Sequence, residues 1–162
     1  MKYIINKPNL SSLEKKYVLE ALSSTWLSSG GKNTKIFEEK FAKYLGLKNA
    51  LAVQSGTASL HLALKALDVT NKDYVVIPNF TCVSNISAAS QCGAKIILVD
   101  VEPETLGMDF EILKKVLKKY KPKALQLVHV YGFPARDTLQ IVKICKKNKI
   151  KIIEDSSEAL GA

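Results

Sequence analysis

Two groups of polar residues follow apolar stretches of the chain and have the types and spacing of a ligand site. The first is Ser55-Gly56-Thr57, which lies between the apolar stretch 51–53 and a helical repeat of leucines that begins at Leu60. A helix that starts here presents unpaired backbone N–H groups and the positive end of its dipole, which attract an anion such as phosphate. Gly56 has no Cβ to keep a ligand away from the backbone. The alternative is that Ser55 and Thr57 serve only as helix caps.

The second group begins at Asp155, which directly follows the apolar stretch 150–154. Its carboxylate should lie at the rim of a sheet, partly removed from water, where an acid needs a cation or a strong hydrogen-bond donor. The alternative is that Asp155 caps a following helix. The turn Ser55-Gly56-Thr57, here called the anion corner, and a carboxylate in one parallel sheet suit a phosphorylated heteroaromatic cofactor whose ring nitrogen must stay protonated. Pyridoxal 5′-phosphate has that shape, and a carboxylate at its ring nitrogen maintains its capacity as an electron sink.

Apolar runs that alternate with helical patterns surround these two groups. Strands are predicted at residues 50–54, 74–78, 95–100, 124–130 and 150–154, and helices at 58–67, 81–91, 110–120 and 137–148. The strands lack a clean apolar–polar alternation, which is typical of a parallel sheet covered by helices on both faces. The sequence therefore predicts an α/β fold. Ligands bind such sheets beyond the carboxyl ends of the strands, so the polar residues that follow the strands should gather at one rim.

The N-terminal part predicts two helices joined by a loop that contains paired glycines. Ser11 and Glu14 have the spacing of a capping box at the start of a helix that ends near residues 23–24. The loop spans residues 26–33, and an apolar face at residues 36–45 then marks a second helix that Gly46 ends.

Composition excludes several classes of protein. The 162 residues are 47% hydrophobic with a mean hydropathy of +0.03, which is typical of a folded globular chain. No apolar run approaches the length of a membrane span, and the first residues lack the pattern of a signal peptide. We therefore expect a cytoplasmic protein that has no membrane partner.

Charge and cysteine usage narrow the choice further. The net charge is +9, but the lysines have helical spacing on predicted outer faces and helix ends, and Arg136 is the only arginine. We therefore expect no nucleic-acid partner. Cys82, Cys92 and Cys145 lack CxxC spacing, which argues against a disulfide framework and a structural zinc site, so no metal is expected. We expect these cysteines to be buried as small apolar residues.

Several blocks of the sequence, in order along nearly the whole chain, resemble the sugar aminotransferases of the DegT/StrS type. The blocks are residues 26–31 before Phe37-Glu38, 55–64, 76–81, 93–94 with 99–101, 128–132 with Pro134, and 153–162. The resemblance implies a pyridoxal-phosphate enzyme of the aspartate aminotransferase fold, and this chain would be the N-terminal part of its mostly parallel, helix-flanked large domain. The glutamate at position 158 makes the sequence most similar to the perosamine-synthase branch of the family, which aminates nucleotide-linked 4-keto sugars. The resemblance also implies glutamate as the amino donor and a homodimer.

The resemblance assigns roles to individual residues. Gly56, Thr57 and Ala58 would bind the cofactor phosphate, and Asp155 would pair with the pyridinium nitrogen. Glu158 stands near the cofactor's phenolic oxygen, where many members carry Gln or His.

Two further positions follow from the same resemblance. Cys82 stands where the family often has an aromatic residue stacked on the ring, and a thiol gives a thinner contact. Ser29 and Gly30 resemble a substrate-side loop that reaches a neighbouring subunit's site. No role is assigned to His129 or Tyr131.

One family feature is absent from the sequence. The Schiff-base lysine of the family lies downstream of the Asp155 block, and no lysine of this chain, which stops at Ala162, matches its motif. We therefore expect residues 1–34 to form an N-terminal helix and substrate-side loop, and residues 35–162 an incomplete cofactor domain that is inactive alone.

Two other functions stay open on the sequence. One is a non-catalytic remnant that keeps the anion corner and pairs with a partner that carries the lysine. The other is a phosphosugar isomerase-like domain that uses Ser55 and Thr57 to bind a sugar phosphate.

Overall fold

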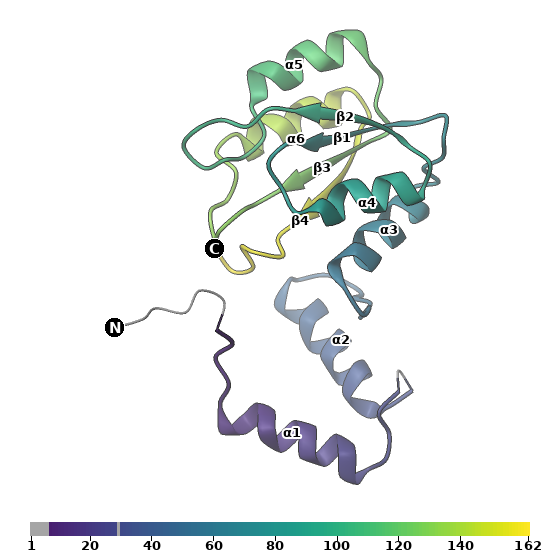
Figure 1. The fold of residues 1–162 in the computed structure, drawn as a ribbon, viewed down its shortest axis with the longest axis vertical. Coiled ribbons are helices and arrows are strands. Elements are labelled where there is room, and N and C mark those ends of the chain that lie inside the picture. The colour runs from purple at the N-terminus through teal and green to yellow at the C-terminus, as the bar shows by residue number, and fades with distance from the viewer. Residues whose placement is uncertain (1–6, 29) are drawn as a thin grey trace. The chain divides into compact units, whose positions relative to one another are not determined.

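The computed structural model, drawn in Figure 1, describes residues 7–28 and 30–162. It divides into two compact units, with the division between Ala52 and Val53. The boundary that the sequence suggests after residue 34 stays a prediction. No helix in the described ranges is both long enough and apolar enough to cross a membrane.

The N-terminal unit contains two helices, α1 (Ser12–Ser23) and α2 (Lys32–Tyr44). The predicted capping box is confirmed: the Ser11 hydroxyl accepts a hydrogen bond from the N–H of Leu13, and the Glu14 carboxylate accepts one from the N–H of Ser11 at 2.6 Å. Gly46 follows α2 with a φ of +66°, a conformation that favours glycine, so the predicted helix end is also confirmed.

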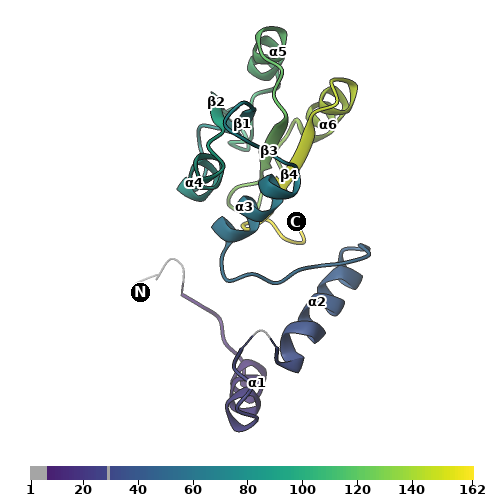
Figure 2. The ribbon, with the colours of Figure 1, turned by 90° about the vertical axis from the view of Figure 1, so that its right-hand side faces the viewer.

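The second unit is an α/β fold, as predicted. Its four strands are β1 (Tyr74–Pro78), β2 (Lys95–Val99), β3 (Ala124–Val128) and β4 (Lys151–Asp155), paired in parallel in the order β2-β1-β3-β4. The helices are α3 (Gly56–Ala66), α4 (Val83–Gln91), α5 (Phe110–Lys119) and α6 (Thr138–Lys147). Figure 2 shows α3 and α4 on one face of the sheet and α5 and α6 on the other.

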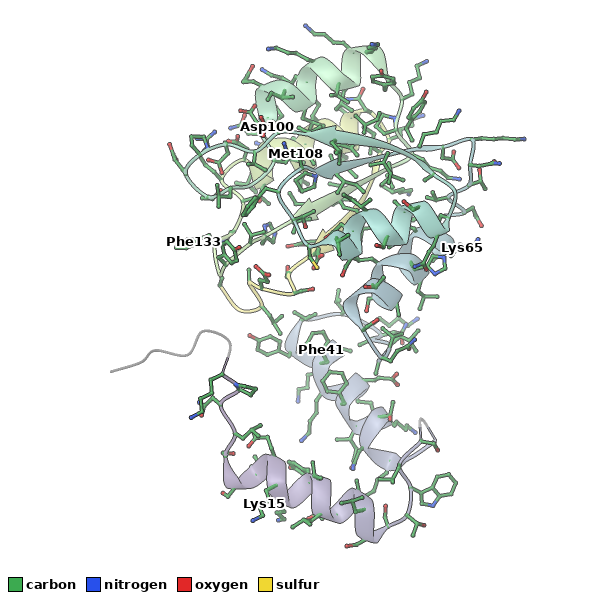
Figure 3. All side chains as sticks on the ribbon, in the orientation of Figure 1. Lys15, Phe41, Lys65, Asp100, Met108 and Phe133 are labelled. Carbon is green, nitrogen blue, oxygen red and sulfur yellow. The ribbon has the colours of Figure 1, made fainter. Side chains whose placement is uncertain are left out.

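Strand pleating sorts the buried residues between these two faces, because successive side chains of a strand point to opposite sides. Val76 on β1 packs in the core under α5 and α6, together with Met108, which is labelled in Figure 3. Its neighbours Val75 and Ile77 pack in the core under α3 and α4. Ile153 of β4 also packs on that second core, so Asp155, two residues further on, lies on the same side of the sheet.

The strand predicted at residues 50–54 is wrong. The structure has no strand there, and Leu51 is 68% and Val53 36% exposed. A strand forms only where a neighbouring strand completes its backbone hydrogen bonds, and no described strand pairs with this segment. The segment instead has no regular secondary structure up to the start of α3.

The predicted helix boundaries hold closely at α4 and α5. The carboxylate of Asp109 accepts a hydrogen bond from the N–H of Ile112, 2.9 Å away, and so caps α5 as predicted. Gly93 follows α4 with a φ of +73°. Asp137 makes no such cap for α6; its carboxylate instead pairs with the guanidinium of Arg136 at 3.2 Å.

Candidate functional site

A cavity of about 240 Å³ lies at the carboxyl ends of β3 and β4 and beside the first turn of α3. Its lining residues come from four segments of the second unit: Gly56, Leu60, Thr81, Cys82, Ser84, Val128, His129, Val130, Asp155, Ser157 and Glu158. The structure thus brings together four residues that the sequence singled out, namely Gly56, Cys82, Asp155 and Glu158.

The first turn of α3 lies where the sequence predicts a site for an anion. Ser55 caps the helix, because its hydroxyl accepts a hydrogen bond from the N–H of Ala58 at 3.2 Å. Among the described residues, the N–H groups of Gly56 and Thr57 donate to no partner, so both are free for a ligand. Capping and anion binding are therefore compatible here, but the N–H of Ala58 is already used.

Thr57 is not a cap. Its hydroxyl donates to the hydroxyl of Ser84 on α4, 3.0 Å away. This bond joins the start of α3 to the start of α4, which lies beside it on the same face of the sheet. The Thr57 side chain therefore fixes the position of the anion corner relative to the segment that follows β1.

Asp155 lies at the end of β4 with three hydrogen-bond donors around its carboxylate. Oδ1 accepts from the N–H of Ser157 at 3.1 Å and from the Ser157 hydroxyl at 2.6 Å. Oδ2 accepts from the side-chain amide of Asn85 at 3.0 Å. Residues 157–161 form turns rather than a helix, so the helix-cap alternative for Asp155 is wrong.

Sequence reasoning missed Asn85 and Gln126, which are both fully buried. The side-chain amide of Asn85 donates to Gln126 Oε1 at 2.7 Å, and Gln126 Nε2 donates to the backbone carbonyl of Asn85 at 3.3 Å. A signal was present, because Gln126 is the one polar residue in the otherwise apolar strand β3. A polar residue in a strand that is buried along its whole length needs a specific partner.

Glu158 contacts the loop that follows β3. Its carboxylate accepts a hydrogen bond from the N–H of Tyr131 at 2.9 Å. Tyr131 has a φ of +54°, and its ring lies edge-on to Phe80 with the centroids 6.1 Å apart. Glu158 therefore orders this loop while it lines the cavity.

His129 is held between the same loop and β4. Its Nδ1 accepts a hydrogen bond from the N–H of Ala135 at 2.9 Å, which leaves the proton of a neutral ring on Nε2. Nε2 then donates to the carboxylate of Glu154 at 3.0 Å. The structure thus gives His129 a structural role at the cavity wall.

Cys82 is exposed, which corrects the expectation that all three cysteines are buried. It follows β1 at the cavity rim, where polar residues were expected to gather, and its Sγ lies 3.2 Å from the hydroxyl of Ser84. Hydrogen bonding with the Ser84 side chain and backbone N–H lowers the pKa of the Cys82 thiol. Cys92 and Cys145 are buried as expected, and burial raises the pKa of Cys145 to about 11.

Two further sequence predictions concern the substrate-side loop and metal binding. Ser29 lies outside the described residues, and Gly30 belongs to the N-terminal unit, so the substrate-side loop stays a prediction. No cluster of potential metal ligands occurs in the part of the chain that the structure describes.

A parallel α/β sheet with an anion corner and a carboxylate that open into one cavity defines the class of phosphate-cofactor binding domains. Within that class, the chain belongs to the DegT/DnrJ/EryC1/StrS aminotransferase family, whose sequence model matches residues 8–162.

Individual relatives agree with this assignment. GDP-perosamine synthase of Escherichia coli O157:H7 is 40% identical over 163 residues, which cover 100% of this chain and 44% of that protein. An aminotransferase structure from Psychrobacter cryohalolentis superposes with a TM-score of 0.88 at 30% identity and covers 96% of this chain and 39% of that one. GDP-4-keto-6-deoxymannose-3-dehydratase, solved with a trapped PLP-glutamate geminal diamine, superposes with a TM-score of 0.88 at 29% identity. The match covers 99% of this chain and 42% of that one. The chain thus spans less than half the length of these relatives.

Pyridoxal phosphate is the cofactor of this family, and the residues present fit it. Gly56 lines the cavity, and a Cβ placed on it would make no contact closer than 3.9 Å, with the Ser157 hydroxyl, among the neighbours outside its own turn. The carboxylate of Asp155 faces the same cavity with one oxygen, Oδ2, that accepts a single hydrogen bond. A carboxylate oxygen has two lone pairs, so Oδ2 keeps an acceptor position for a ring N–H.

Proposed function

We propose that this chain supplies the cofactor-binding part of a pyridoxal-phosphate-dependent aminotransferase that acts on a nucleotide-linked keto sugar. One observation carries the proposal: Gly56, at the start of α3 with its free N–H group, and Asp155 line a single cavity. An anion site and a carboxylate on one cavity suit a ligand with a phosphate at one end and a basic ring nitrogen at the other.

Different residues at the cavity bind the phosphate and orient the ring of that ligand. The N–H groups of Gly56 and Thr57 bind the phosphate with the help of the helix dipole. Asp155 holds a proton at the ring nitrogen, and Glu158 faces the phenolic oxygen. Bound pyridoxal phosphate supplies an electron sink for the exchange of an amine and a ketone.

The chain does not supply every group that the reaction needs. Among the residues that the structure describes, no lysine lines the cavity. The proposal therefore places the Schiff-base lysine in the part of the relatives that this chain does not span, and the chain alone is expected not to transaminate.

The relatives support the substrate class. Two of them carry GDP-linked sugars in their names, GDP-perosamine synthase and GDP-4-keto-6-deoxymannose-3-dehydratase. For this chain we therefore propose a nucleotide-linked keto sugar as the substrate and glutamate as the amino donor. We also propose that the protein forms a homodimer in the cytoplasm, and that Ser29 and Gly30 belong to the substrate-side loop.

Calorimetric titration with two probes tests the binding part of the proposal. Pyridoxamine phosphate carries the ring and the phosphate but needs no lysine, so it should bind at one saturable site. Glucose 1-phosphate should bind more weakly than pyridoxamine phosphate or not at all. Tight binding of glucose 1-phosphate without binding of pyridoxamine phosphate would instead favour a phosphosugar-binding domain and overturn the proposal.

A further inference from the structure

We propose that the buried amide pair Asn85 and Gln126 positions the carboxylate of Asp155 for the ring nitrogen of the cofactor. Asn85 and Gln126 are positioning residues, because only Asp155 faces the ligand. The inference rests on the proposed function in one respect: the cofactor is what Asp155 is positioned to meet.

The hydrogen bonds of Asn85 leave its side chain one orientation. The hydroxyl of Thr81 donates to Asn85 Oδ1 at 2.7 Å. The orientation is set by Gln126, because its Nε2 must face the Asn85 backbone carbonyl, which can only accept, and this turns Gln126 Oε1 toward the nitrogen of the Asn85 amide. That nitrogen donates to Gln126 Oε1 at 2.7 Å and to Asp155 Oδ2 at 3.0 Å. Both N–H bonds of the amide and its oxygen are therefore used. Turning the amide over would place Oδ1 against two other oxygens.

Gln126 is the anchor of this arrangement. It lies in the middle of β3, which is buried along its whole length, and the pleat places it on the face that carries α4. Its oxygen accepts from the Asn85 side chain, and its nitrogen donates to the Asn85 backbone carbonyl. Two bonds between the same two residues fix both the side chain and the backbone of Asn85 relative to the sheet.

The carboxylate of Asp155 is thereby held from two sides. Ser157 donates twice to Oδ1, and Asn85 donates once to Oδ2. Ser157 belongs to the turn next to Asp155, whereas Asn85 is attached through Gln126 to the neighbouring strand. The bond from Asn85 is therefore the one that ties the plane of the carboxylate to the sheet rather than to a local turn.

An amide pair is a poor choice for stability alone. Burying two side-chain amides loses their hydration, and matched apolar residues of similar shape fill such positions with little or no loss of stability. What leucines at these positions cannot do is donate a hydrogen bond to Asp155. This difference separates a positioning role from a packing role, and it can be measured.

The test compares the wild type with Asn85→Leu and with the double variant Asn85→Leu/Gln126→Leu. The single variant leaves Gln126 Oε1 unpaired and should lose stability, whereas the double variant removes both amides and should recover it. Asn148→Leu is the matched control, since Asn148 lies at the end of α6 and bonds only locally to Ile144. Each protein is titrated with pyridoxamine phosphate that carries ¹⁵N in the ring, and the χ1 rotamer of Asp155 is read from three-bond couplings without ligand.

We expect Asp155 to occupy one rotamer in the wild type and in Asn148→Leu, and several in the double variant. The double variant should bind pyridoxamine phosphate about tenfold more weakly, the usual effect of a lost hydrogen bond to a charged group, and its ring ¹⁵N signal should shift toward that of the unprotonated ring. A folded double variant that keeps one Asp155 rotamer and the wild-type ¹⁵N signal would overturn the inference. If the wild type binds no pyridoxamine phosphate, the proposed function fails, and the rotamer of Asp155 still decides whether the amide pair positions it.

Discussion

Gly56 and Ser157 face each other across the candidate site: a Cβ on Gly56 would lie 3.9 Å from the Ser157 hydroxyl, with nothing nearer. An added methyl group at Gly56 would therefore make an ordinary van der Waals contact with the turn after β4. The space between Gly56 and Ser157 lies next to the two free N–H groups of α3.

Gly56→Ala should therefore separate binding from stability. Alanine fits the helical backbone at this position and meets only an ordinary van der Waals neighbour, so the melting temperature should stay the same or rise slightly. The added methyl group occupies the approach to the N–H groups, and the affinity for pyridoxamine phosphate should fall. Thermal unfolding and calorimetric titration of the same preparation measure the two effects.

Gly107→Ala is the contrasting control, because its Cβ would lie 2.5 Å from the Cβ of Ala135 and 2.8 Å from its Cα. The backbone at Gly107 or at Ala135 must therefore move, which lowers the free energy of unfolding by about 1–3 kcal/mol. A Gly56→Ala protein that binds the ligand like the wild type would remove the start of α3 from the phosphate site.

Asp155→Asn tests the other end of the cavity. Asparagine keeps the size of the side chain and can still accept from Ser157, so the fold should persist. It removes the negative charge that stabilises a protonated ring nitrogen, and the affinity for pyridoxamine phosphate should fall about tenfold or more in a calorimetric titration.

Asp68→Asn is the control for the charge change. Asp68 lies in the turn after α3 with a φ of +54°, which asparagine tolerates well. Its affinity should equal that of the wild type. Equal affinities of all three proteins would show that Asp155 does not contact the ring.

Local signals in the sequence predicted most helices and strands of the fold. The features that depend on tertiary contacts could not be predicted in this way. The capping box at Ser11 and the cap at Asp109 depend on neighbours a few residues away, so both could be read directly. Residues 50–54 have the composition of a strand but lack a paired strand in this structure, which no local pattern reveals.

The candidate site shows the same division. Asp155 was predictable because a polar residue at the end of a buried parallel strand lies at the ligand rim. Its partner Asn85 was not, because the contact depends on the pleat of β3 and on which side of α4 faces it. The polar residue Gln126 inside a buried strand was the one signal available, and it indicated that some partner was needed without naming it.

Cys82 should be the one cysteine that reacts in the folded protein. It is exposed, and the hydrogen bond with Ser84 lowers its thiol pKa below the usual 9.0, whereas burial raises the pKa of Cys92 and Cys145. Iodoacetamide should therefore modify Cys82 alone, with a rate that reaches half its maximum below pH 9, because the thiolate is the reacting form. Mass spectrometry of peptides from the labelled protein gives the site.

Bound ligand should slow this reaction, since Cys82 lines the cavity. Saturating pyridoxamine phosphate should protect the thiol, and the variant Ser84→Ala should shift the rate profile to higher pH. Labelling that is unaffected by a ligand shown to bind would place that ligand elsewhere.

Glu102 should make the stability of the second unit depend on pH. Burial raises the pKa of this carboxyl, but hydrogen bonds from the Thr105 hydroxyl and from the N–H groups of Glu104, Thr105 and Gly107 outweigh it, so the pKa lies below the usual 4.5. A carboxyl whose pKa is lower in the folded than in the unfolded protein adds stability above its unfolded pKa, and this stability is lost as the pH falls through the folded value.

The variant Glu102→Gln measures this contribution. Glu102 is 1% exposed, so the loss of its charge-assisted bonds should lower the unfolding free energy by about 1–3 kcal/mol at pH 7. In urea titrations the difference from the wild type should stay constant down to about pH 5 and shrink at lower pH, because the wild-type carboxyl then takes up a proton. Glu111→Gln, at an exposed position of α5, is the control and should differ little from the wild type at any pH. A difference between Glu102→Gln and the wild type that does not change between pH 7 and pH 3 would show that packing, and not the charge of Glu102, holds the loop before α5.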